Sequence, residues 1–234
     1  STLGKPTTTA PQPTPTPQFS KSSQTDTPAF KKWFGESKVV DAEGKPMVVY
    51  HGTDADFSTF DTSKSSSGAA FGPGIYLTKD ASNTNWKRGP GANVMPVYVT
   101  IRNPFDIRRP LTSGEAEALQ NIGIKSAKEG EPAPLFTMER KFGSIGQAAE
   151  AAGFDGLLHF GPAGQEHILA FSPTQIKSAI GNNGNFDGSS NNILLSKGNP
   201  QPTPQDRAIA QQAGIKLRHA PASKGVIGDI KQRI

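Results

Sequence analysis

The stretch Met47-Val-Val-Tyr-His-Gly-Thr53 is the part of this 234-residue sequence that decides its fold. Its first four residues are β-prone, and a Gly and Pro turn separates them from a similar run at Lys38–Asp41, so the pair predicts a hairpin. At the strand end, Gly52 allows a flat ligand to approach the backbone, and His51 and Thr53 supply polar side chains. Taken alone, the tripeptide is more typical of a strand that ends in a surface turn.

Further short β-prone runs follow along the chain, at residues 74–78, 94–101, 154–159 and 167–171. Helical patterns lie at residues 79–88 and 144–152, and residues 110–135 are interpreted as an insertion with a possible helix over residues 113–120. Short strands outnumber regular βαβ units, which favours an α+β fold with mainly antiparallel sheets. No Gly-x-Gly-x-x-Gly opens a helix after a strand, so a Rossmann dinucleotide site is disfavoured.

Composition divides the chain into three parts. Residues 1–29 are rich in Thr and Pro and predict a disordered linker, because they hold too little apolar surface to offset the entropy of ordering. Residues 30–188 are the expected folded domain, which begins with an aromatic cluster. Residues 189–234 are expected to be a basic tail with one short helix. Residues 196–234 hold seven Lys and Arg against two Asp, so this segment carries the whole net charge of +5. A solvated tail is the simpler interpretation, and contact with a nucleic acid is the other.

The composition also excludes several classes of protein. Without Cys there is no disulfide framework and no thiolate nucleophile. No run approaches the roughly 20 apolar residues of a membrane span, so we expect a soluble protein without a membrane partner. His159 and His167 are isolated histidines, which are more typical of strand residues than of metal ligands, and no metal is expected.

Three further features could carry chemistry. Phe71-Gly-Pro-Gly-Ile-Tyr76 places two glycines before a strand Tyr, and Trp86 follows ten residues later. Two such aromatic rings could clamp a planar nicotinamide by stacking. Glu166 supplies one carboxylate at the entry of an apolar strand. Taken alone, the Gly-Pro-Gly motif also fits a turn before a core Tyr, Trp86 fits an ordinary core residue, and Glu166 fits a solvated strand end.

Together, in this order, these motifs resemble the ADP-ribosyltransferase superfamily. The likeness is to its His-Tyr-Glu branch, which includes diphtheria toxin and the poly(ADP-ribose) polymerases. Closer still, the sequence resembles the transferase modules of phage and mobile-element polyvalent proteins across residues 30–188. The motifs that carry this likeness are Trp33-Phe-Gly-x-Ser-Lys-Val-Val-Asp41, Tyr50-His-Gly-Thr53, Asn103-Pro104, Gly153-Phe-Asp-Gly156 and Phe171-Ser-Pro-Thr-Gln-Ile-Lys-Ser-Ala179.

The resemblance implies split, mainly antiparallel sheets with a few helices around a cleft for NAD, which is the substrate. His51 would hold a ribose hydroxyl, the Gly52 backbone would bond the nicotinamide carboxamide, and Thr53 matches the small hydroxyl residue of the motif. Tyr76 and Trp86 would enclose the nicotinamide ring. Glu166 would be the key catalytic residue, because its carboxylate stabilises the positive charge that develops as nicotinamide leaves.

The register of the last strand leaves one alternative open. Glu166 stands five residues before Phe171, and the family's catalytic position could lie there or at His167. A shift of one residue turns a side chain to the opposite face of a strand. Glu166 is the only carboxylate in the segment and is therefore the predicted catalyst. The Glu-x-Glu or Gln-x-Glu pattern of the arginine-specific branch is absent, so arginine is not supported as acceptor.

The expected function is mono-ADP-ribosyl transfer from NAD to a macromolecular acceptor, either protein or RNA or DNA. The embedded-module likeness suggests a toxin, effector or phage-delivered glycosyltransferase that acts in the cytoplasm of a host or target cell. An NAD glycohydrolase is the first alternative, because the same pocket serves both reactions. A non-catalytic NAD- or ADP-ribose-binding module, or a virion structural segment, is the second. The sequence leaves the acceptor and the oligomeric state open.

Overall fold

The computed structural model describes residues 22–55, 57–65, 69–85, 93–161, 164–180, 182 and 186–194. The helices are α1 (Ser22–Thr25), α2 (Pro28–Phe34), α3 (Ser113–Asn121), α4 (Leu135–Phe142) and α5 (Ile145–Ala151), with short 3-10 turns η1 (Thr62–Lys64), η2 (Ala81–Asn85) and η3 (Pro173–Gln175). The strands are β1 (Val49–Thr53), β2 (Ile75–Thr78), β3 (Asn93–Val99), β4 (Pro104–Asp106), β5 (Gly156–Phe160), β6 (Glu166–Ala170) and β7 (Ile176–Ser178). The expected α+β class is confirmed.

The described strands form one sheet in the order β4-β5-β6-β2-β1-β3-β7. Every neighbouring pair is antiparallel except β4 with β5. The join between β1 and β2 consists of a single register pair, Tyr50 with Thr78, whereas β1 and β3 share five pairs and β2 and β6 share four. We call this junction the seam. It divides the sheet into two halves, as expected for split sheets.

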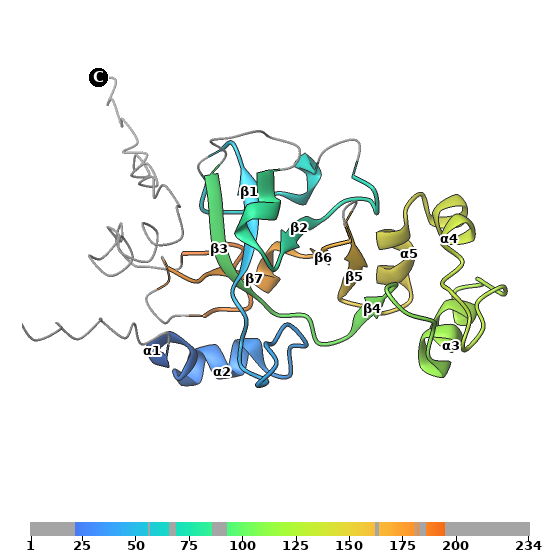
Figure 1. Cartoon of the computed structure of the whole chain (residues 1–234), viewed down its shortest axis with the longest axis horizontal. Helices are drawn as coiled ribbons and strands as arrows, with labels where there is room; N and C mark the ends of the chain where they lie inside the picture. Colours follow the sequence, from blue (N-terminus) through green and yellow to red (C-terminus); the bar gives the residue numbers. More distant parts are fainter. Residues whose placement is uncertain are drawn as a thin grey trace, which may run out of the picture.

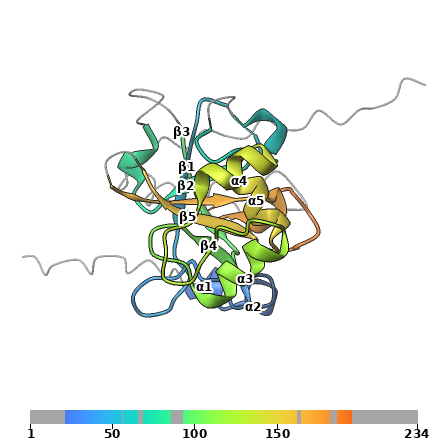
Figure 2. The same ribbon diagram turned by 90° about the vertical axis from the view of Figure 1, so that its right-hand side faces the viewer.

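Each face of the sheet is covered by its own hydrophobic core, because successive side chains of a strand point to opposite faces. On one face, Leu157 and Leu169 pack against α3, α4 and α5. On the other face, Leu77 and Ile168 pack with residues of β1, β3 and β7. Figure 1 shows α3, α4 and α5 gathered beside β4 and β5, whereas α1 and α2 lie apart from them. In Figure 2 the same three helices face the viewer.

Residues 110–135, interpreted as an insertion, pack into the core of the domain, and the possible helix over residues 113–120 corresponds to α3. α3 begins with a capping box, in which Thr112 and Glu115 bond each other's backbone N–H groups. The side chains of Leu119 and Ile124 are fully buried beside Met138 of α4. This segment therefore builds the helical layer that covers β4 and β5.

The ordered fold extends past both expected boundaries of the domain. Residues 22–29, expected in the linker, contain α1 and the start of α2, which Thr27 caps by accepting a hydrogen bond from the Phe30 N–H. At the other end, Ile193, expected in the tail, is 1% exposed and packs in the core of the sheet. At the N-terminal end α2 packs through Phe30 and Trp33 on Phe186, and at the C-terminal end Asn192 forms a β-bridge with Thr59.

Local expectations are met in part. The hairpin expected at residues 38–50 is a turn closed by a single bridge between Val40 and Pro46. The helix expected at residues 79–88 is the short turn η2 over its described part, and its last residues lie outside the described ranges. Among the described residues, no helix combines the length and apolar character needed to cross a membrane.

Candidate functional site at the seam

The backbone groups of Gly52 point into the seam. The Ala179 N–H donates to the carbonyl of Pro96 on β3 (N···O 3.0 Å), so the Pro96 carbonyl faces β7 and not β1. The register partner of Pro96 is Tyr50, whose own polar groups therefore face β2. Gly52 lies two residues after Tyr50 on the same strand, so its backbone groups point to the same side as those of Tyr50. Its N–H and C=O thus face β2 beyond Thr78, where the register pairing of β1 with β2 has ended.

The imidazole of His51 crosses this junction. Its Nδ1 lies 2.9 Å from the carbonyl oxygen of Tyr76 on β2. The ring packs edge-on against Phe60, at 5.0 Å between centroids, and against Phe57 at 6.3 Å. The backbone of β2 and two aromatic rings therefore fix the position of His51.

Gly52 and Thr53 have structural roles that the sequence did not reveal. A Cβ on Gly52 would lie 2.6 Å from the carbonyl oxygen of Thr84, so η2 packs directly on β1 where the side chain is missing. The space expected to be open to a ligand beside Gly52 is therefore filled by η2. A ligand can still approach Gly52 from the edge that faces the seam. Thr53 is buried, and its Oγ1 accepts a hydrogen bond from the Ala55 N–H (3.1 Å).

Tyr76 is held through its hydroxyl group. The hydroxyl donates to the Gly72 carbonyl (2.9 Å) and accepts from the Phe71 N–H (3.2 Å). Burial raises the pKa of Tyr76, which keeps the phenol neutral. These bonds tie the glycine-containing loop to β2, and they orient the Tyr76 ring toward His159, at 6.2 Å between centroids.

Glu166, the first residue of β6, is paired with two cations. Its Oε1 accepts a hydrogen bond from Arg108 Nη1 (2.6 Å), and its Oε2 pairs with Lys79 Nζ. The hydrogen bond to Lys79 and the charge of Arg108 lower the pKa of Glu166 against the smaller opposing effect of burial. The side chain is 36% exposed. Glu166 is therefore an ionised carboxylate that solvent or a ligand can reach.

The alternation of the strands separates the expected site residues by face. Tyr76 pairs with Leu169 in the β2–β6 register, so Tyr76 shares its face with His167 and Glu166 points to the other face. His51 shares the face of Glu166, since its neighbour Tyr50 pairs with Thr78. The structure thus brings His51 and Tyr76 together at the seam through a backbone contact, and it sets Glu166 and Tyr76 on opposite faces.

Comparison with known proteins identifies the family. Residues 41–186, more than half of the chain, match the model of a family described as ADP-ribosyltransferase in polyvalent proteins. The chain belongs to this family. No curated protein and no solved structure matches the chain. The matched range contains His51, Tyr76 and Glu166.

The remaining expected site residue of this ADP-ribosyltransferase domain is Trp86. Trp86, the expected second ring of the nicotinamide site, lies outside the described residues. Within the described ranges, no three His, Cys, Asp or Glu side chains group in a way that could hold a metal ion.

Sequence reasoning missed the two cations that contact Glu166. Lys79 directly follows β2, and Arg108 follows β4, 58 residues before Glu166. The only local signal is the run Asp106-Ile-Arg-Arg109 after a strand, and such a run is also typical of a solvated surface. Only the pairing of β4 with β5 and of β5 with β6 brings it to Glu166.

A cavity of about 570 Å³ lies elsewhere on the transferase domain. It is lined by residues of α2 and of the segment from Phe171 to Gln175, together with Arg102 and Asp155. None of the expected NAD-site residues is among its lining, so the seam and this cavity are separate features.

Proposed function

We propose that this chain is an NAD-dependent mono-ADP-ribosyltransferase whose substrate occupies the seam. The observation that carries the proposal is the geometry of the seam itself. Gly52 directs a backbone donor and acceptor into it from one side, and His51 spans it to reach Tyr76 on the other. A primary carboxamide needs such a donor and acceptor pair, and the family match makes nicotinamide the expected carrier of that carboxamide.

The proposed roles follow from these positions. The Gly52 backbone bonds the carboxamide, His51 bonds a ribose hydroxyl, and Thr53 holds the end of β1 in place. Tyr76 and Trp86 enclose the nicotinamide ring. The Tyr76 hydroxyl already bonds the Gly72 carbonyl, and the ring lies on the face of the sheet opposite Glu166, so Tyr76 contributes only its ring.

In the proposed reaction, the bond between the nicotinamide nitrogen and the ribose C1′ breaks, and its electron pair leaves with nicotinamide. The ribose then carries oxocarbenium-like positive charge. The ionised carboxylate of Glu166 stabilises this charge and accepts a hydrogen bond from the ribose 2′-hydroxyl. A nucleophilic atom of the acceptor bonds to C1′ and loses a proton. His167, the open alternative for this position, is neutral, because burial lowers the pKa of its imidazole, and so it supplies no negative charge.

Glu166→Gln tests the mechanism. The amide keeps an acceptor oxygen for Arg108 but has no charge, so we expect NAD turnover to fall below about 1% while the Kd for NAD stays within about threefold. Glu139→Gln, an exposed carboxylate on α4, is the matched control and should turn over NAD normally. Unchanged turnover in Glu166→Gln would refute the assigned role.

The acceptor is proposed to be a macromolecule, either protein or nucleic acid, reached after delivery by a phage or mobile element, as the polyvalent-protein family suggests. Incubation of the protein with labelled NAD and cell lysate separates transfer from hydrolysis. Label that stays on protein or nucleic acid supports transfer, and mass spectrometry then identifies the modified group. Release of free ADP-ribose alone would identify an NAD glycohydrolase. Binding of NAD without turnover would identify a non-catalytic module.

A further inference from the structure

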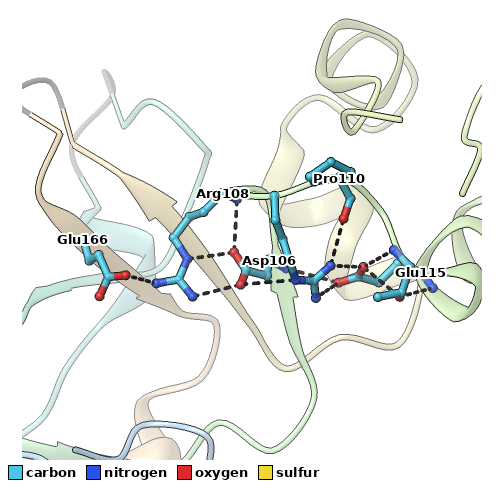
Figure 3. Close-up of polar contacts among 7 residues, drawn as sticks. Asp106, Arg108, Pro110, Glu115 and Glu166 are labelled. Atoms are coloured by element: carbon cyan, nitrogen blue, oxygen red, sulfur yellow. Dashed lines mark hydrogen bonds and ion pairs between the residues drawn. The ribbon is translucent and has the colours of Figure 1, made fainter. Parts of the chain in front are cut away.

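Arg108 is held in place by Asp106 before it reaches Glu166. Its Nε and Nη2 donate to the two carboxylate oxygens of Asp106, at 2.8 and 2.9 Å, and its backbone N–H donates to Asp106 Oδ1 at 3.1 Å. This two-point contact leaves Nη1, which donates to Glu166 Oε1 at 2.6 Å (Figure 3). One planar guanidinium therefore connects the two carboxylates in a fixed direction.

Asp106 is itself fixed in the sheet. It is the last residue of β4 and pairs with Leu158 of β5, and its side chain is 13% exposed. Burial alone would raise the pKa of Asp106, but the hydrogen bonds and charges of Arg108 and Arg109 lower it below its usual value. Asp106 is therefore a charged, buried anchor for Arg108.

The anchor continues to the first turn of α3. Arg109 donates to both carboxylate oxygens of Glu115, at 2.8 and 3.0 Å, and Glu115 closes the capping box of that helix. Arg109 also lies 3.6 Å from Asp106 Oδ2, so a line of alternating charges runs from Glu166 through Arg108, Asp106 and Arg109 to Glu115. Figure 3 shows Glu166, Arg108, Asp106 and Glu115 along it. The exposed fraction of the carboxylate side chains rises along it, from 7% at Glu115 to 36% at Glu166. The line is thus buried at α3 and open at Glu166.

We propose that Asp106 and Arg108 are positioning residues that set the direction of the Glu166 carboxylate. The proposal rests on the proposed role of Glu166 in ADP-ribosyl transfer. A glutamate at the start of a strand, 36% exposed, has several rotamers available, and the Arg108 guanidinium selects one of them. Lys79 also contacts Glu166 through the other carboxylate oxygen, but its ammonium lacks the planar set of donors of a guanidinium, so its contact is less directional.

The test compares Arg108→Gln, Arg108→Lys and Asp106→Asn, with Arg140→Gln on the exposed surface of α4 as the control. We expect Arg108→Gln to lower kcat for NAD about tenfold or more, since small misplacements of a reacting group have large effects, with KM changed less than about twofold. Arg108→Lys should restore less than half of the lost activity, because an ammonium cannot bond Asp106 and Glu166 in one plane. Asp106→Asn keeps the Arg108 charge but loosens its direction, and it should also lower kcat. The control should equal the wild type.

The pH profile separates positioning from a merely structural role. Arg108 lowers the pKa of Glu166, so its removal raises that pKa and moves the acid limb of kcat/KM toward neutral pH. Loss of fold would lower activity at every pH and would not shift the limb. In the double variant Asp106→Asn/Arg108→Gln, kcat should be no lower than in Arg108→Gln alone, because both residues act on the same carboxylate.

Three outcomes would overturn the inference. Normal kcat in Arg108→Gln and Asp106→Asn would show that Glu166 needs no support. A raised KM with unchanged kcat would make Arg108 a substrate-binding group, and additive losses in the double variant would give the two residues independent roles. These failures differ from that of the proposed function, which would appear as a wild-type protein that does not turn over NAD.

Discussion

His51 Nδ1 lies 2.9 Å from the carbonyl oxygen of Tyr76, across the seam between β1 and β2. A carbonyl oxygen can only accept a hydrogen bond, so Nδ1 carries a proton, and in the neutral form of the ring Nε2 is then the acceptor nitrogen. The contact therefore determines both the orientation and the tautomer of the imidazole. An acceptor at Nε2 suits a ribose hydroxyl, which is the role proposed for His51.

Substitution of His51 should separate its two roles. His51→Asn can still donate to the Tyr76 carbonyl through its amide, so we expect thermal stability close to that of the wild type but a KM for NAD raised about tenfold. His51→Leu loses both contacts and should also be less stable, by about 1 kcal/mol. Thermal denaturation and NAD kinetics measure the two effects. Equal stability of the two variants would contradict the importance of the seam contact.

Gly52→Ala should impair both the fold and the binding of NAD. The new methyl group would lie 2.6 Å from the Thr84 carbonyl, a backbone atom, so η2 or β1 must move, at a cost of about 2 kcal/mol. Gly114→Ala is the matched control, since an added Cβ there has no neighbour within 4 Å. Within α3, that substitution should stabilise the protein by about 0.5 kcal/mol. Urea denaturation and NAD titration provide the readouts, and a Gly52→Ala protein as stable as the wild type would contradict the packing described.

Stability should fall as the pH is lowered from about 6.5 to about 4. Burial lowers the pKa of His159 to about 4, and it also lowers that of His167. The unfolded chain, with an ordinary histidine pKa of about 6.5, therefore binds protons in this range that the folded protein does not. Above about pH 6.5 the contribution of these two neutral histidines to the free energy of unfolding is fully present. In His159→Leu the slope of unfolding free energy against pH should become smaller, and an unchanged slope would disprove the assignment.

Removal of residues 189–194 should destabilise the domain strongly. Lys177 is fully buried, and its Nζ donates to the carbonyls of Ser190 (2.6 Å) and Asn192 (3.2 Å). A chain that ends at Gly188 loses these acceptors together with the buried Ile193, and we expect a loss of at least about 3 kcal/mol relative to a chain that ends at Leu194. Chemical denaturation of the two lengths measures it. The difference should shrink when both carry Lys177→Met, and two equally stable lengths would show that the boundary at residue 188 is sufficient.

The sequence predicted those elements whose pattern is local. The β-prone runs at residues 47–50, 74–78, 94–101, 154–159 and 167–171 correspond to β1, β2, β3, β5 and β6, with ends that differ by a few residues. The Ala-rich run after Ser144 is the helix α5, which Ser144 caps by accepting a hydrogen bond from the Gln147 N–H. In these cases the apolar spacing and the turn residues lie within one short window of sequence.

Features that depend on distant contacts were not predictable. Ile124 follows α3 and Met138 lies within α4, and both are buried only because these helices close over β4 and β5. The separation of Tyr76 from Glu166 depends on the register of β2 with β6, which no local pattern specifies. The contact of Arg108 with Glu166 likewise depends on the order of the strands. The family motifs thus predicted the candidate site residues, and the topology determined how these residues are oriented.

The single register pair of the seam has a consequence for substrate binding. β1 and β2 are neighbours in the sheet, yet they share only the register pair of Tyr50 with Thr78. Under the proposed binding mode, a carboxamide bonded to Gly52 continues that pairing by one step. The carboxamide of the substrate would then add hydrogen bonds at the junction of the two halves of the sheet, and departure of nicotinamide would remove them.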